Sequence, residues 1–363
     1  MRKLLTFLIL ALFTGLLFAS NEENADRKEE EQYEEAIAQK EGFKPDEVII
    51  DHIIDAYEWH ITTIGHTHVS IPLPVILYSE HSGFHVFCSS KFHHGHSKYL
   101  NFEIAKDGPY KNKIVEILPD GTIYRPWDFS ITKNVLAAFI SMILLFWIFV
   151  SAARRYQANP LRAPKGIQSW VEPIVIFIRD DVAKASIGEK KYEKYLPFLL
   201  TVFFFIWINN MLGLVPIFPG GANVTGNITV TGSLALFTFL ITTFSGNKHY
   251  WKEIFNPEVP WWLKFPLPLM PLIEFMGIFI KPFVLMVRLF ANITAGHIVA
   301  LGFYTLIFVF GHMNVAAGYG VSVVSIAFTV FLALLELLVA FIQAYVFTLL
   351  SALYFGMATA EHH

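Results

Sequence analysis

The stretch PFVLMVRLFANITAGHIVALGFYTLIFVFGHMNVAAGYGVSVVSIAFTVFLALLELLVAFIQAYVFTLLSALYFGMATA, residues 282–360, decides the fold of this chain. It contains one Arg or Lys, Arg288, and one Asp or Glu, Glu336. An apolar run of this length crosses a bilayer more than once, because one helical crossing needs about 20 residues. An ionisable side chain inside a membrane is costly and indicates a functional site. The pattern predicts a positive charge held in the membrane, with protons brought near it.

The composition of the whole chain agrees with a membrane protein. Of its 363 residues, 54% are hydrophobic and 16% are charged, and the mean hydropathy is +0.48. These values are typical of a polytopic helical membrane protein with a soluble portion and exclude a water-soluble enzyme. The net charge of −3 gives no indication of nucleic-acid binding. Cys88 is the single cysteine, which excludes an intrachain disulfide and a cysteine metal site.

The N-terminus has the pattern of a secretory signal peptide, which we assign to residues 1–20. Two basic residues, Arg2 and Lys3, precede an apolar run that ends at Phe18, and two small residues follow. The run is short for a membrane span, and an uncleaved first anchor is the alternative. Residues 21–130 are then expected to form an exported module.

Within this module, short apolar segments alternate with turn residues, which predicts a small β-rich fold. Ile71–Tyr78 and Asn101–Ala105 are candidate strands. Ile114–Leu118 and Thr122–Tyr124 flank the tripeptide Pro119-Asp120-Gly121. Proline, aspartate and glycine in succession favour a tight turn, so these two segments are expected to form a hairpin.

Residues 131–363 are predicted to be an all-α polytopic membrane domain with about five crossing helices. The last two apolar segments are each longer than 35 residues. As helices they measure more than about 50 Å, against a hydrocarbon core of about 30 Å. Such helices are expected to tilt strongly or to break. The expected spans are residues 135–153, 196–218, 228–245, 269–310 and 321–358.

The distribution of positive charge predicts the orientation of these spans. The loop 154–195 carries nine Lys or Arg residues, and the loop 246–268 carries three. The loops 219–227 and 311–320 carry none. Cytoplasmic loops are enriched in Lys and Arg, so the N-terminal module is expected outside and the C-terminus inside. The signal peptide predicts the same orientation independently.

The fourth span carries a polar stripe. Glu274, Lys281 and Arg288 are seven residues apart, which places them within about 40° of one another on a helix. Asn292, one turn beyond Arg288, lies on the same side. His297 is nine residues from Arg288 and faces nearly the opposite way, so it is expected to contact a different neighbour.

The fifth span carries a second polar line, which contains Glu336 and Gln343 two turns apart. The simplest hairpin between the last two spans brings Glu336 near His297, and Gln343 near Arg288. Burial and mutual interaction bring the pKa values of a histidine and a carboxylate near neutrality, so such a pair is suited to relaying protons. The full line is Ser325, Thr329, Glu336 and Gln343.

At these residues the chain resembles a known family. The string KPFVLMVRLFAN, residues 281–292, resembles the signature of subunit a of bacterial F-type ATP synthases. The string IQAYVF, residues 342–347, and the closing Met357-Ala358 are similar to the same family. Asn210–Pro216, before a glycine-rich loop, also fits it. The resemblance covers roughly residues 130–363 and does not extend to the exported module.

The resemblance implies a role for each matching residue. Arg288 would face the carboxylates of a rotating c-ring, with Asn292 and Gln343 supporting it. Gly213 departs from members that have a carboxylate at this position, which would leave the proton path to rely on His297 and Glu336. The implied proton-translocation residues are Arg288, Asn292, His297, Glu336, Gln343, Glu274 and Asn210, with His297 and Glu336 in the outer half-channel and Glu274 in the cytoplasmic one.

The resemblance further implies a non-catalytic stator subunit that couples proton flow to ring rotation and ATP synthesis. No cofactor and no metal are expected on this chain. Its implied partners are the c-ring, b-type peripheral stalk subunits, the rest of the ATP synthase and the lipid of a bacterial inner membrane. The family does not decide between H⁺ and Na⁺, because the coordinating site lies on the ring.

Two other functions remain as alternatives. A secondary proton-coupled transporter usually has inverted repeats, and we detect none in the sequence. A haem or metal protein is suggested by the 14 histidines, of which nine lie in residues 52–96. They are in the exported module and not in spans, which argues against haem between helices and leaves weak zinc or copper binding open.

Overall fold

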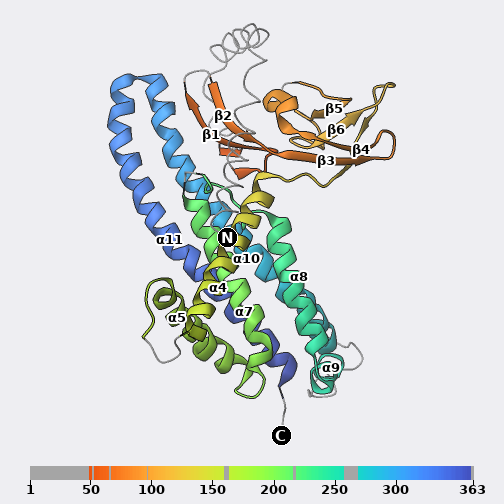
Figure 1. Ribbon diagram of the computed structural model, residues 1–363, viewed down its shortest axis with the longest axis vertical. Helices are drawn as coiled ribbons and strands as arrows, with labels where there is room; N and C mark the ends of the chain where they lie inside the picture. Colours follow the sequence, from red (N-terminus) through yellow and green to blue (C-terminus); the bar gives the residue numbers. More distant parts are fainter. Residues whose placement is uncertain are drawn as a thin grey trace.

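The computed structural model of the chain describes residues 49–50, 53–64, 67–95, 97–158, 163–215, 218–256 and 269–360. The predicted signal peptide, residues 1–20, lies outside the described residues. Figure 1 shows a bundle of helices with a β-rich region at one end of it. The α10–α11 hairpin extends beside this region, and the C-terminus lies at the opposite end of the bundle.

Five helices are long and apolar enough to cross a membrane, which confirms the predicted number. The helix α10 continues through Pro282 without interruption. The prediction of a loop at 311–320 is wrong, because only Asn314 separates the last two helices. The five helices are α4 (Lys133–Ala158), α7 (Tyr192–Leu214), α8 (Ile228–Ser245), α10 (Leu269–Met313) and α11 (Val315–Thr359).

The turn between α10 and α11 is tight for two local reasons. The side chain of Asn314 accepts a hydrogen bond of 2.9 Å from the backbone N–H of Ala316 and caps the start of α11. A Cβ added to Gly318 would lie 2.7 Å from the Cα of Gly311. The two backbones therefore approach each other in a way that only glycine allows, and the helices diverge little at the turn.

The core of the bundle lies around α7. Leu199, Phe203 and Ile206 of α7 are fully buried and belong to the same apolar cluster as Phe347 of α11. The polar side chains in this core are paired between helices. Asn209 Nδ2 donates to Ser141 Oγ at 2.9 Å, and this bond joins α7 to α4. In a membrane such bonds hold helices together, because hydrophobic burial drives their association less than in water.

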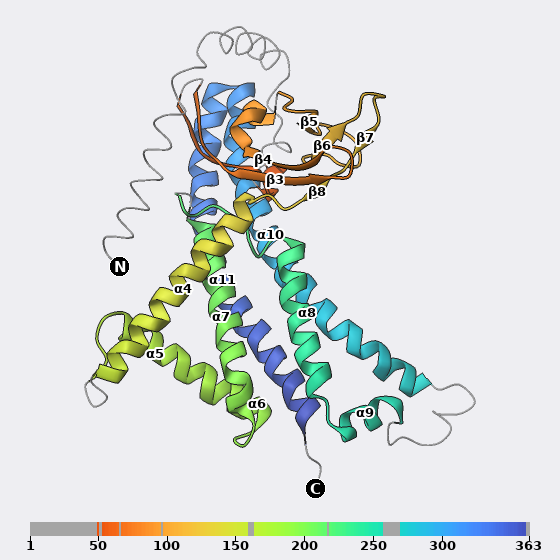
Figure 2. The ribbon, with the colours of Figure 1, turned by 45° about the vertical axis from the view of Figure 1, so that its right-hand side comes forward.

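Short helices lie between the spans at the end of the bundle that is opposite the β-rich region (Figure 2). Within η2, Arg179 and Lys184 lie 2.8 and 3.0 Å from the Asp180 carboxylate and hold its pKa well below the usual range. Two of the nine basic residues in segment 154–195 are thus paired with a carboxylate. The short helices are α5 (Ile167–Phe177), η2 (Ile178–Lys184), α6 (Ala185–Ile187) and α9 (Lys248–Phe255).

The β-rich region consists of three small sheets. The predicted hairpin is confirmed, since Ile117 pairs with Ile123 and Gly121 takes a φ of 81° in the turn. Ile71–Tyr78 is not one strand but is divided between β2 and β3. The sheets are β1 (Glu58–Ile64) with β2 (Thr67–Pro72), β4 (Gly83–Cys88) with β3 (Pro74–Ser79) and β8 (Trp127–Asp128), and β5 (Phe102–Ile104) with β6 (Ile114–Ile117) and β7 (Ile123–Tyr124).

Direct contacts attach this module to the bundle. Asp55 accepts hydrogen bonds from Thr132 Oγ1 at 2.7 Å and from the Asn134 backbone N–H at 3.0 Å, which caps the start of α4. The ring of Trp59 meets that of Phe218 edge to face, with centroids 5.1 Å apart. These contacts fix how the module sits on the helices.

Candidate functional site

Arg288 lies on the outside of α10. Leu285 and Leu289, on either side of it, are buried in the core, whereas Arg288 itself is exposed. Among the described residues, no hydrogen bond or ion pair reaches its guanidinium. Asn292, one turn further along, is also exposed. This edge of α10 therefore presents a cation and an amide on an otherwise apolar surface.

The other two members of the predicted stripe lie towards the start of α10. Lys281 Nζ lies 5.9 Å from the centre of the Tyr354 ring on α11, within the range of a cation–π contact. Glu274 lies close enough to Tyr250 of α9 for its charge to affect the pKa of the Tyr250 hydroxyl. Burial raises the pKa of the Tyr250 hydroxyl, and the charge of Glu274 raises it further. Glu274 thus lies beside α9.

His297 and Glu336 face each other across the α10–α11 interface, as the sequence predicts. The distance from His297 Nδ1 to Glu336 Oε1 is 3.7 Å, and both side chains are 17% exposed. This distance is longer than a hydrogen bond, and one water molecule between the two groups would let them exchange a proton. The pair is on the side of α10 away from Arg288.

Gly296 makes room for this pair, which sequence reasoning missed, and a second glycine, Gly213, borders it. A Cβ on Gly296 would overlap Glu336 Oε1. A Cβ on Gly213 of α7 would lie 3.7 Å from His297 Nε2. Gly213, the position at which the sequence departs from members that have a carboxylate there, is thus adjacent to the histidine. A longer side chain at that position would therefore reach the same ring.

Asn210 is buried on α7 and both ends of its amide are engaged. Its Nδ2 donates to the carbonyl oxygen of Ala340 at 3.3 Å, and its Oδ1 accepts from Thr225 Oγ1. These bonds join α7 to α11 and to the loop before α8. The amide therefore holds three segments together next to the pair.

The polar line on α11 is largely buried. Ser325 and Gln343 are 2% and 6% exposed. The hydroxyl oxygens of Thr329 on α11 and Thr294 on α10 are buried, and neither has a hydrogen-bond partner among the described residues. Buried hydroxyls of this kind usually bind ordered water. The proximity of Gln343 to Arg288 stays a prediction.

The glycine at 296 gives a direct test of the pair's geometry. In Gly296→Ala the added methyl displaces the Glu336 carboxylate, and we expect the unfolding free energy to fall by about 1–3 kcal/mol, as for an overpacked core site. Gly302→Ala is the matched control on the same helix, because nothing lies within 4 Å of a Cβ there. Thermal unfolding in detergent measures both. An equal effect of the two substitutions would contradict the close approach of Gly296 to Glu336.

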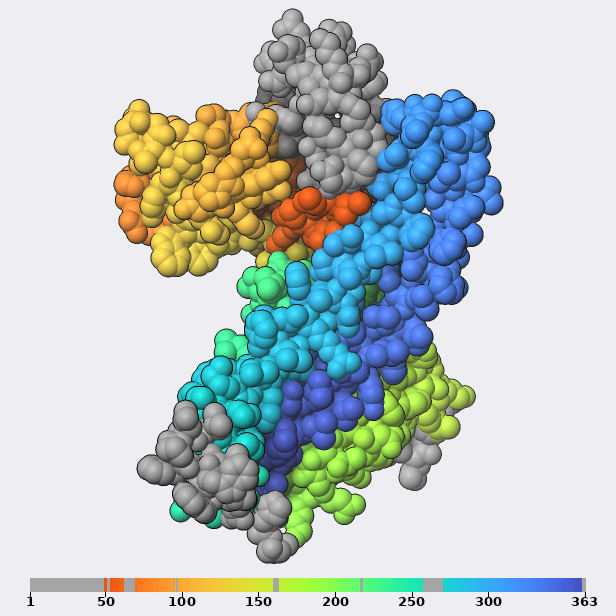
Figure 3. Space-filling view, turned by 180° about the vertical axis from the view of Figure 1, so that it is seen from behind, coloured from red at the N-terminus to blue at the C-terminus, as the bar shows by residue number. Residues whose placement is uncertain are grey.

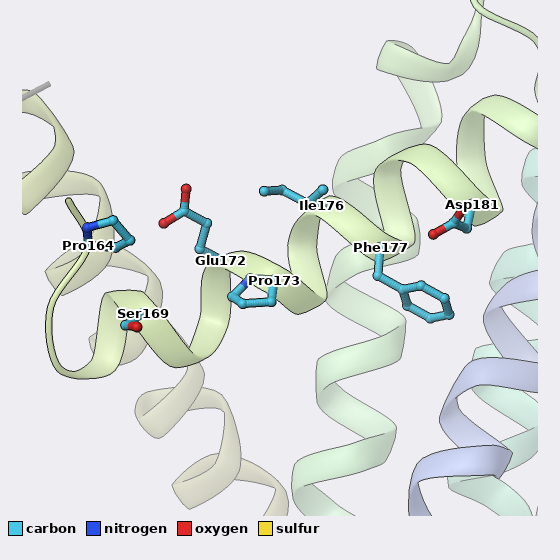
Figure 4. Close-up of a pocket in the computed structure, with 7 residues that line it drawn as sticks. All are labelled: Pro164, Ser169, Glu172, Pro173, Ile176, Phe177 and Asp181. Atoms are coloured by element: carbon cyan, nitrogen blue, oxygen red, sulfur yellow. The ribbon is translucent and has the colours of Figure 1, made fainter. Parts of the chain in front are cut away.

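Figure 4 shows a concave surface on α5 and η2, lined by carboxylates and apolar side chains. Glu172 and Asp181 lie along it with Phe177 and Ile176. It is formed by the short helices between α4 and α7 and contains none of the predicted site residues. We therefore do not assign the function to it.

The histidines of the module do not form a metal site within the part of the chain that the structure describes. No group of three or more His, Cys, Asp or Glu residues there has the geometry to hold an ion. His85 Nε2 instead contacts the carbonyl oxygen of Ser82 at 3.0 Å, and the His81 ring packs against Tyr124. These two side chains have ordinary structural contacts.

Comparison with known proteins decides the family. The model of the family described as ATP synthase A chain matches residues 135–356, which is more than half of the chain. This range includes α7, α8 and α10 and all but the first residues of α4 and the last residues of α11. The chain belongs to the ATP synthase A chain family. A second model, described as a domain of unknown function (DUF8433), matches residues 48–129.

Curated relatives agree with the ATP synthase A chain family. "ATP synthase subunit a" of Chloroherpeton thalassium is 44% identical over 257 residues, which are 67% of this chain and 72% of the relative. "ATP synthase subunit a 2" of Chlorobaculum tepidum is 45% identical over 266 residues, 69% and 71% of the two chains. "ATP synthase subunit a" of Myxococcus xanthus is 43% identical over 243 residues, 65% and 75% of the two chains. Membership of this family and the five long apolar helices together show that the chain is a multi-pass membrane protein.

Proposed function

We propose that this chain is the stator ion-channel subunit of a rotary F-type ATP synthase, in which Arg288 faces the carboxylates of a c-ring. One observation carries the proposal. Arg288 is exposed on an apolar helix that spans the membrane, with no partner for its charge among the described residues. An unpaired guanidinium in lipid has a high free energy, so we expect an anionic side chain of another chain to bind at this surface.

The electrostatics of such a contact account for coupling. A ring carboxylate that faces lipid is protonated, because the ionised form is costly there. Near Arg288 the ionised form is stabilised, so the proton leaves. The same positive charge repels protons moving directly between two offset half-channels. A proton then crosses by riding the ring, and each charge that crosses provides about 2.3 kcal/mol per 100 mV.

The remaining polar residues fit the two half-channels. We assign His297 and Glu336 to the outer half-channel, supported by their 3.7 Å separation. Glu274, which lies beside Tyr250 of α9, belongs to the cytoplasmic half-channel. Asn292 and Gln343 support the ring contact, and Asn210 borders the outer path. This chain has no covalent chemistry in the proposal, and ATP synthesis takes place on partner subunits.

We further propose that the chain lies in a bacterial inner membrane with residues 21–130 in the periplasm and the C-terminus in the cytoplasm. The positive charge of loop 154–195 supports this orientation. The 45-residue helices α10 and α11 support strong tilting, because each is about 67 Å long and the hydrocarbon core is about 30 Å thick. Tilted helices are suited to follow the curved wall of a ring.

The partners provide the test of this proposal. The tagged chain, solubilised in mild detergent, is expected to copurify with a ring of small c subunits, b-type stalk subunits and the catalytic sector. Mass spectrometry of the purified complex identifies them. A tagged chain that purifies as a lone oligomer and transports a substrate with protons would instead favour the secondary transporter.

A further inference from the structure

The module carries an exposed aromatic sheet face that the bundle does not cover. Side chains directly opposite each other in antiparallel strands project from the same face. Tyr78 of β3 is opposite both Phe84 of β4 and Trp127 of β8, so these three rings lie together. Val86, opposite Ile76, and Phe129, beyond β8, belong to the same face. We call these five exposed residues, Tyr78, Phe84, Val86, Trp127 and Phe129, the aromatic face.

The opposite side of the same sheet is the core of the module. Val75 and Leu77 of β3 are fully buried against Phe102 of β5 and Ile114 of β6. By contrast, Phe84 and Trp127 of the aromatic face are 66% and 61% exposed. Soluble surfaces rarely gather so many large apolar residues in one place unless something covers them.

The position of the sheet indicates what covers it. The β5–β6–β7 sheet lies on the side away from α4 and α8, so the aromatic face is turned toward the end of the bundle at which these two helices begin (Figures 1 and 2). Figure 3 shows the module extending sideways beyond the bundle, with no described segment beneath its outer part. This space lies next to helices that are long and apolar enough to cross a membrane.

The chain itself limits the distance to the membrane. Only residues 129–132 lie between β8 and the start of α4 at Lys133. At about 3.5 Å per residue, Asp128 is within roughly 18 Å of that helix. The bonds from Asp55 to Thr132 and Asn134 fix this junction. The sheet is therefore tethered close to the end of α4 that faces the module.

We infer that the aromatic face rests on the lipid surface of the bilayer beside the bundle and anchors the module to it. Tryptophan and tyrosine are the residues that accumulate at membrane interfaces, because their rings are apolar and their polar groups remain hydrated. Phe84, Val86 and Phe129 supply the apolar area that an interfacial contact buries. The inference concerns the module alone and does not depend on ion transport.

Spin labels at single cysteines test this contact in the full chain. With Cys88→Ser removing the single cysteine, nitroxides are attached at Phe84→Cys, at Trp127→Cys and, as the control, at Asp107→Cys. Asp107 is exposed in the loop between β5 and β6, two strands that pack against the buried side of β3 and not on the aromatic face. The protein is placed in vesicles of phosphatidylethanolamine and phosphatidylglycerol, and collision with oxygen is compared with collision with a water-soluble nickel complex.

We expect positions 84 and 127 to be reached by oxygen and protected from nickel, with a several-fold higher oxygen-to-nickel ratio than at position 107. Nickel access at 84 and 127 equal to that at 107 would overturn the inference, because the face would be in water. Protection from both reagents would overturn it as well, since a second copy or another protein would then cover the face. Circular dichroism equal to that of the parent shows that each labelled chain is folded, and two positions keep the test independent of either substitution.

Discussion

Arg288→Ala is expected to abolish ATP-driven proton pumping while the complex still assembles. At 4 Å, two unit charges interact with about 4 kcal/mol at an effective dielectric constant near 20. Loss of this interaction corresponds to a rise of roughly three units in the pKa of a ring carboxylate that faces the stator. The carboxylate then keeps its proton at this position, and rotation is no longer coupled to release. Quenching of an acridine dye in inverted membrane vesicles measures the pumping.

The matched control removes an arginine that is not in the proposed site. Arg154 is exposed at the C-terminal end of α4, and Arg154→Ala is expected to leave pumping unchanged. The amounts of c and b subunits that copurify with each variant separate loss of coupling from loss of assembly. Normal pumping by Arg288→Ala in an intact complex would contradict the proposed role.

His297→Ala and Glu336→Ala are each expected to lower pumping by roughly 10²-fold, the scale on which a positioned acid or base usually acts. The two groups lie 3.7 Å apart and are proposed to act as one relay, so the double variant is expected to pump no more slowly than either single variant. The exchange His297→Glu with Glu336→His keeps a titratable pair at the same two positions. It is therefore expected to pump faster than either alanine variant.

The chain has a second histidine–glutamate pair that serves as the control. His249 Nδ1 and Glu253 Oε2 are 4.0 Å apart on α9, outside the spans, with side chains 40% and 63% exposed. Alanine at both positions is expected to leave pumping within about twofold of the parent, since exposed pairs contribute little. If the losses at His297 and Glu336 simply multiply, the two residues do not act as a unit.

Hydropathy predicted the spans well, with errors at their ends that have a physical cause. α8 begins and ends at the predicted Ile228 and Ser245. α4 extends from Lys133 to Ala158, beyond the predicted 135–153, because a helix continues into polar flanks that an apolar window excludes. The segment 311–320 was predicted to be a loop between two spans, but only Asn314 separates the helices, and Gly311 and Gly318 allow them to pack closely there.

The site was predictable to the extent that helical spacing determines it. Spacing placed Arg288 and His297 on opposite sides of one helix, and a tight hairpin brought Glu336 to His297. The spacing of residues along α10 and α11 does not predict how closely α7 approaches them. The approach of Gly213 to His297, and the space that Gly296 leaves for Glu336, therefore became visible only in three dimensions.

The position of the Arg288 guanidinium in the assembled complex decides whether this chain couples proton flow as proposed. A structure of that complex in lipid measures the distance from this guanidinium to the nearest ring carboxylate. We predict a separation within about 6 Å, the range over which a cation favours the ionised carboxylate. A guanidinium in bulk water, or one that no ring subunit approaches, would contradict the account.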